Sequence, residues 1–103
     1  MDSLEHITST IRQVAIENKA VKAILFGSHA RGTPTAHSDI DVVFVEITRE
    51  RFLERIDKYL SKLTDRLSSA VEVLVYTPEE YAGMQGTPFM KCVMSEGIVI
   101  YEH

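Results

Sequence analysis

Three short runs of β-branched and apolar residues constrain the fold of this chain most strongly. They cover residues 21–26 (VKAILF), 39–46 (DIDVVFVE) and 71–76 (VEVLVY). Runs of this length and composition are typical of strands in a largely buried sheet. Segments with helical periodicity lie before, between and after them, so the sequence predicts an α/β domain with helices packed on a central sheet.

The segments between these runs carry helix signals. Asp2 and Glu5 have the form of a capping box, and the dipeptides Thr77-Pro78 and Thr87-Pro88 are typical helix starts. The predicted elements, in chain order, are helix 3–18, strand 21–26, loop 27–38 with a short helical turn from Ser28, strand 39–46, helix 49–67, strand 71–76, a helix starting at Thr77, helix 88–96 and strand 98–101.

Size and composition limit the classes of function. A length of 103 residues predicts one domain, residues 1–103. Fifteen acidic against eleven basic residues give a net charge of −4, which disfavours direct nucleic-acid binding. A single cysteine, Cys92, excludes an internal disulfide and favours the cytoplasm; we expect its side chain to be buried. The sequence has no apolar run of about 20 residues and no signal-peptide pattern at its start, so no membrane association is expected.

The segment that carries chemistry joins the first two strands. Gly27-Ser28 follows the first strand, and Asp39 and Asp41 begin the second. Alternation along a strand places these two carboxylates on one face, about 6–7 Å apart. A glycine lets backbone N–H groups approach an anion, and Ser28 and Arg31 add donors. The pattern therefore predicts a phosphate-binding turn facing a carboxylate pair.

Glu72 is the third carboxylate candidate. Glutamate is uncommon in strands, so its presence inside the apolar run 71–76 indicates a specific role. If strands 39–46 and 71–76 are neighbours, Glu72 lies beside the two aspartates. Three acids facing a phosphate site would hold Mg²⁺ or Mn²⁺, the arrangement used in phosphoryl and nucleotidyl transfer. Two alternatives stay open: Glu72 could face solvent or pair with a lysine, and Arg31 could form a surface salt bridge.

Two other kinds of site are rejected. His29 and His37 flank the segment but lack zinc-ligand spacing with any cysteine, so we interpret them as loop histidines. The spacing of Gly27 and Gly32 is similar to a P-loop, but the lysine that such a loop needs is missing.

The stretch FGSHARGTPTAHSDIDVVF closely resembles the signature of the DNA polymerase β superfamily, in the version found in minimal nucleotidyltransferases (MNT), also called MNT-type antitoxins. The segments VEVLVYTPEEY and EGIVIYEH are similar to the same family, which differs in having Asp as the third acid. The resemblance implies a nucleotidyltransferase fold, a mixed sheet of about four strands flanked by helices. It also implies that Gly27 and Ser28 contact nucleotide phosphates, and that Asp39, Asp41 and Glu72 bind the metal and serve catalysis.

The resemblance further implies a partner, a HEPN-domain toxin ribonuclease encoded beside the chain. We therefore expect an enzyme that transfers AMP from ATP to a hydroxyl of that toxin, with tyrosine as the acceptor, and acts as its antitoxin in a homo- or hetero-oligomer. One alternative is a non-catalytic antitoxin that neutralises the ribonuclease by binding. Another is a small-molecule nucleotidyltransferase of the aminoglycoside type.

Overall fold

The fold is organised around one sheet of four strands, with the strand order β3-β2-β1-β4. The computed structural model describes residues 2–103. It confirms every predicted helix and strand to within a few residues at each end, including the short turn at Ser28. The elements are α1 (Leu4–Glu17), β1 (Lys22–Phe26), α2 (Ser28–Arg31), β2 (Ile40–Val45), α3 (Phe52–Arg66), β3 (Val71–Tyr76), α4 (Pro78–Gly83), α5 (Pro88–Glu96) and β4 (Ile98–Glu102).

The sheet is mixed, as predicted. β1 pairs with both β2 and β4 in the antiparallel sense, and β2 pairs with β3 in the parallel sense. A parallel pair needs a crossover connection, and α3 supplies it. Strands 39–46 and 71–76 are therefore neighbours, which was the condition for placing Glu72 beside the aspartates, and the helix between them in sequence makes this pairing possible.

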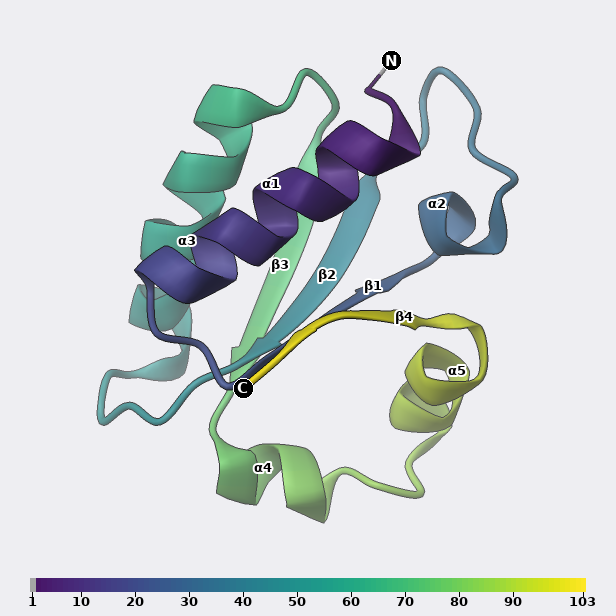
Figure 1. The fold of residues 1–103 in the computed structure, drawn as a ribbon. Coiled ribbons are helices and arrows are strands. Elements are labelled where there is room, and N and C mark those ends of the chain that lie inside the picture. Colours follow the sequence, from purple (N-terminus) through teal and green to yellow (C-terminus); the bar gives the residue numbers. More distant parts are fainter. Residues whose placement is uncertain (1) are drawn as a thin grey trace.

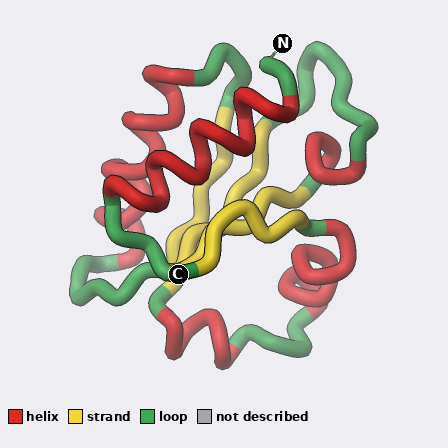
Figure 2. Tube along the Cα trace, in the orientation of Figure 1, coloured by secondary structure: helices red, strands yellow, loops and turns green. Residues whose placement is uncertain are grey.

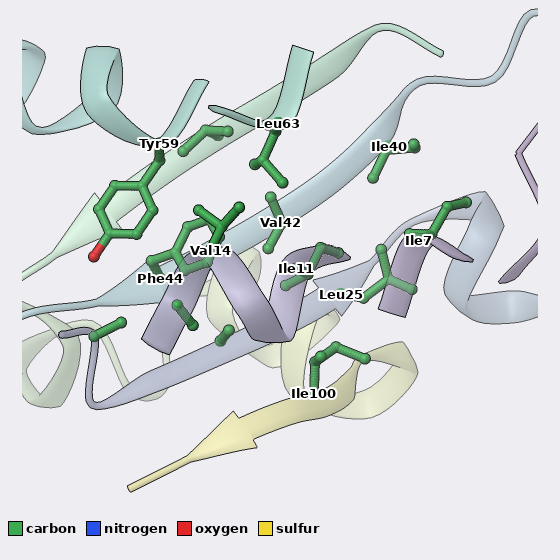
Figure 3. Packing of buried hydrophobic residues seen from close by; sticks show 14 of the residues in the cluster. Ile7, Ile11, Val14, Leu25, Ile40, Val42, Phe44, Tyr59, Leu63 and Ile100 are labelled. Atoms are coloured by element: carbon green, nitrogen blue, oxygen red, sulfur yellow. The ribbon is translucent and has the colours of Figure 1, made fainter. Parts of the chain in front are cut away.

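The larger part of the core lies on the sheet face that α1 and α3 cover (Figure 1). Tyr59 of α3 is fully buried and stacks on Phe44 of β2, with ring centroids 4.2 Å apart. Its hydroxyl donates a 2.6 Å hydrogen bond to the buried carboxylate of Glu46, which satisfies both groups. Figure 3 shows this packing, in which Val14 and Ile11 of α1 join the same cluster. The helical apolar faces read from the sequence thus build one core.

The opposite sheet face carries a smaller apolar cluster beneath α4 and α5. Ile24 and Val43 contribute from the strands, and Met90 and Val93 contribute from α5. Asp41 is two residues before Val43 on the same strand, so its side chain lies on this face. The candidate site is therefore on the α5 side of the sheet, away from the main core.

Two local predictions were wrong. The N-cap of α1 is Ser3, whose hydroxyl accepts a hydrogen bond from the His6 amide, and Asp2 instead accepts bonds from the backbone of Ser68 and Ser69. These bonds hold the pKa of Asp2 near 2, although burial opposes the shift. Cys92 is exposed, because it lies on the outer side of α5 from Met90 and Val93. Within residues 2–103, no helix has the length and apolar character needed to cross a membrane.

Candidate active site

The register of the sheet brings Asp41 and Glu72 together. The two residues are direct partners in the parallel β2–β3 pairing, and Asp41 is also the partner of Phe26 at the end of β1. Partners in a parallel pair point to the same face, so both carboxyls project toward α5. They lie within hydrogen-bonding reach of each other. The sheet therefore confirms the proximity expected for this pair.

The electrostatics of Asp41 are unfavourable for a carboxylate. Burial, its hydrogen bond with Glu72 and the negative charges of Glu72 and Asp39 raise the pKa of Asp41 from 3.8 to about 6. When Asp41 loses its proton near neutral pH, its negative charge is repelled by those of Glu72 and Asp39. A bound cation would relieve that repulsion.

Asp39 and its loop are tied to the same end of the sheet. The exposed Asp39 directly precedes β2, whose first amide, that of Ile40, donates a 2.8 Å hydrogen bond to the Ala70 carbonyl just before β3. His29 is only 3% exposed, and its Nε2 lies 3.3 Å from the Ser38 carbonyl oxygen. The interpretation of His29 as a loop histidine was therefore wrong: the residue lies in α2 and is buried. It anchors the long loop between α2 and β2 that Figure 2 shows, whereas His37 is exposed.

Gly27 joins the turn to the carboxyl pair. Its φ of +78° lies in the left-handed region that glycine adopts without steric cost. A Cβ at this position would also collide with the Oδ2 atom of Asp41. The backbone of the turn can thus approach the Asp41 carboxylate only because residue 27 has no side chain.

Arg31 and Gly27 share one acidic partner. The Arg31 guanidinium donates a 2.9 Å hydrogen bond to Oε2 of Glu96, at the end of α5. The Gly27 amide donates a 3.1 Å hydrogen bond to Oε1 of the same carboxylate. The Arg31 bond, followed by the Gly27 bond, lowers the pKa of Glu96 against the effect of burial. The salt bridge left open for Arg31 is present, and it lies at the turn rather than at a distance from it.

The donor set fits a hard divalent cation. Mg²⁺ binds carboxylate oxygens and commonly takes only one or two from the protein. Asp41 and Glu72 supply two neighbouring carboxyls whose mutual repulsion a cation would remove. Among residues 2–103, no three His, Cys, Asp or Glu side chains converge closely enough to form a complete metal cage. The structure thus assembles a two-carboxyl pair, with Asp39 beside it.

With this geometry in view, the comparisons with known proteins identify the family. The family model "Polymerase beta, Nucleotidyltransferase" matches residues 9–103. The chain belongs to the polymerase beta nucleotidyltransferase family. The match spans all the site residues above, and it confirms both the expected fold and the expected enzyme class, nucleotidyltransferase.

Solved structures share the fold at low sequence identity. A toxin–antitoxin structure with AMP-PNP superposes with a TM-score of 0.73 and 22% identity, over 93% of this chain and 73% of that chain. A complex of the tri-AMPylated HEPN toxin of Shewanella oneidensis with MNT antitoxin gives 0.68 and 18%, over 98% and 74%. No curated protein is significantly similar in sequence. The nucleotidyltransferase fold is thus shared with structures of toxin–antitoxin complexes, as the resemblance implied.

One residue of the site was missed from the sequence. Glu96 contacts both Gly27 and Arg31, although it lies 65 or more positions further along the chain. The only local signal is its place at the last turn of a helix that Gly97 ends. A Cβ at residue 97 would collide with the Val93 carbonyl oxygen and with Ile24, so this glycine brings the end of α5 close to β1. That contact depends on tertiary packing, and no sequence pattern encodes it.

Proposed function

We propose that this nucleotidyltransferase transfers AMP from ATP to the hydroxyl of a tyrosine in a HEPN-domain toxin, and that it thereby acts as an antitoxin in the cytoplasm. The observation that carries the proposal is the Asp41–Glu72 carboxyl pair beside the Gly27 turn. The fold shared with toxin–antitoxin complexes, one with AMP-PNP and one with an AMPylated HEPN toxin, supports it.

In this proposal one group of site residues binds the phosphates of ATP and another holds the metal ion. The backbone of Gly27, the hydroxyl of Ser28 and the guanidinium of Arg31 bind the β- and γ-phosphates, and the α-phosphorus stays open to the acceptor. Asp41 and Glu72, with Asp39 beside them, would hold Mg²⁺ or Mn²⁺, which when bound would supply charge stabilisation for the phosphates. Residues 27–41 carry one arginine and two aspartates, so without a cation this segment would repel a nucleotide.

The transfer is an in-line displacement at the α-phosphorus of ATP. The tyrosine oxygen forms a bond to the α-phosphorus while the bond from that phosphorus to the bridging oxygen breaks, and pyrophosphate leaves. A carboxylate of the site, Glu72 in our assignment, accepts the phenolic proton as a general base. Glu72 is exposed at the edge of the sheet, so an acceptor from another protein can reach it.

The experiment incubates the chain, Mg²⁺ and ATP labelled at the α-phosphate with the HEPN protein encoded beside it. Wild type should label a tyrosine of the HEPN protein, and the double variant Asp39→Asn/Asp41→Asn should not. Asp57→Asn, an exposed acid on α3, is the matched control and should behave as wild type. Equal labelling by the double variant would show that these acids are not the catalytic site.

A second candidate is an antitoxin that neutralises the ribonuclease by contact alone. It is favoured by one observation: no complete three-residue metal cluster is assembled within residues 2–103. In the same experiment this candidate predicts inhibition of the ribonuclease at a stoichiometric ratio without any label. Transfer of label to an aminoglycoside in place of the HEPN protein would support the small-molecule enzyme.

A further inference from the structure

Glu96 occupies the donors that the proposed function assigns to phosphate. Its two carboxylate oxygens accept separate hydrogen bonds, Oε1 from the Gly27 amide at 3.1 Å and Oε2 from Arg31 at 2.9 Å. The Glu96 side chain is 19% exposed, and that of Arg31 is 49% exposed. The contact therefore lies at the rim of the site, within reach of a ligand that enters from solvent.

A carboxylate and a phosphate compete for such donors. A backbone N–H and a guanidinium bind either anion through charge-assisted hydrogen bonds. The Gly27 amide carries a single hydrogen, so its bond to Glu96 and a bond to a phosphate oxygen largely exclude each other. The surrounding charges make these donors more important for phosphate binding. Asp39, Asp41 and Glu72 are all negative and lie on the same side of the sheet, and the positive side chain at the turn, Arg31, is paired with Glu96.

We propose that Glu96 is a determinant of nucleotide affinity: its carboxylate holds the Gly27 amide and Arg31 in the nucleotide-free protein, and an incoming triphosphate must displace it. The inference rests on the proposed function, because it takes Gly27 and Arg31 as phosphate ligands. Displacement replaces one anion with another on the same donors, and it moves a negative charge away from the entering phosphates.

The packing of α5 allows this exchange without movement of the helix. Met90 and Val93 are fully buried against the sheet, and Gly97 fits tightly between the Val93 carbonyl oxygen and Ile24. These contacts hold the backbone of α5 in place. The Glu96 side chain, at the last turn, can rotate into solvent about its own bonds, as partly exposed side chains do on a nanosecond scale.

The test measures the Kd of a non-hydrolysable ATP analogue with Mg²⁺ by calorimetry. Removal of an internal competitor lowers the apparent Kd by the ratio of total to free donors. We expect Glu96→Ala to bind roughly tenfold more tightly than wild type, a ratio typical of a partly exposed ion pair combined with one backbone hydrogen bond. Glu96→Gln keeps an acceptor for the Gly27 amide but loses the charge that attracts Arg31, so its affinity should lie between the two.

Glu102→Ala is the matched control. It removes the same charge and breaks a surface ion pair, the one to Lys22 at 3.3 Å, at the far end of β1 from Gly27. Its Kd should equal that of wild type, so a general effect of net charge is separated from the local one. Glu96→Gln also covers the case in which the alanine variant folds poorly.

Two results overturn the inference in distinguishable ways. If wild type binds the analogue and both Glu96 variants bind it equally or more weakly, Glu96 only links α5 to α2, and the proposed phosphate site stands. If neither wild type nor the variants bind the analogue, the phosphate site itself is wrong, and the proposed function falls with this inference.

Discussion

The carboxyl pair should lower the stability of the metal-free protein at neutral pH, and Asp41→Asn tests this. The pKa of Asp41 rises from 3.8 to about 6 through burial, the bond with Glu72 and the charges of Glu72 and Asp39. About two pKa units correspond to about 3 kcal/mol at ~1.36 kcal/mol per unit. Because Asp41 is only partly buried, solvent screening reduces this to about 1 kcal/mol.

Proton linkage determines how the stability difference between Asp41→Asn and wild type changes with pH. Between about pH 4 and pH 6 the folded protein keeps a proton on Asp41 that the unfolded chain has lost, so this group's contribution to the free energy of unfolding falls as pH rises. Asparagine carries no such proton and no charge. The variant should therefore equal wild type near pH 4, exceed it by about 1 kcal/mol near pH 7, and keep that advantage at higher pH.

The assay is urea unfolding followed by far-ultraviolet circular dichroism, with EDTA present, at several pH values. The measured quantity is the difference in free energy of unfolding between variant and wild type, which cancels the titration of other groups. Asp57→Asn, an exposed acid of α3, should give a difference that does not change with pH. A flat difference for Asp41→Asn, or a variant less stable than wild type near pH 7, would refute the reasoning.

Three further outcomes follow from the site and the core. Mg²⁺ should raise the melting temperature of wild type and EDTA should reverse the rise, while Asp41→Asn should respond weakly; an equal response would place the ion elsewhere. Gly27→Ala should cost about 1–3 kcal/mol more than Gly32→Ala in urea unfolding, because both residues have positive φ but only a Cβ at Gly27 collides with a side chain. Tyr59→Phe should cost about 1–2 kcal/mol by the same measurement, because Glu46 loses a buried hydrogen bond, and an unchanged stability would contradict that role.

Much of the fold could be predicted because its signals are local. The start of α4 was predicted from the dipeptide Thr77-Pro78, and in the structure Thr77 caps this helix and forms a capping box with Glu80. The strands follow from their composition. The first helix was placed correctly, but its cap was not: Asp2 and Ser3 are both good caps, and the contact of Asp2 with Ser68, far along the chain, decides between them.

The part of the candidate site that lies on adjacent strands could be predicted from the sequence, but the part that depends on how a helix packs could not. Asp41 and Glu72 are partners because α3 supplies the crossover that makes β2 and β3 neighbours, and Glu72 could be singled out because an acid is unusual inside an apolar strand. The contact of Glu96 with Gly27 depends on how α5 lies on the sheet, and the burial of His29 depends on how the loop before β2 closes. Neither has a periodicity or motif that a sequence could show.

The parallel register of β2 and β3 links the alignment of the two candidate acids to packing on the other side of the sheet. Val42 and Val73 are partners that follow Asp41 and Glu72 in this register, and their side chains are buried in the core under α1 and α3. A slip of one residue between the strands would turn Glu72 to the wrong face and bring Val73 out of the core. A well-packed core therefore also preserves the alignment of the two acids, and core substitutions that loosen the register should separate Asp41 from Glu72 before they unfold the protein.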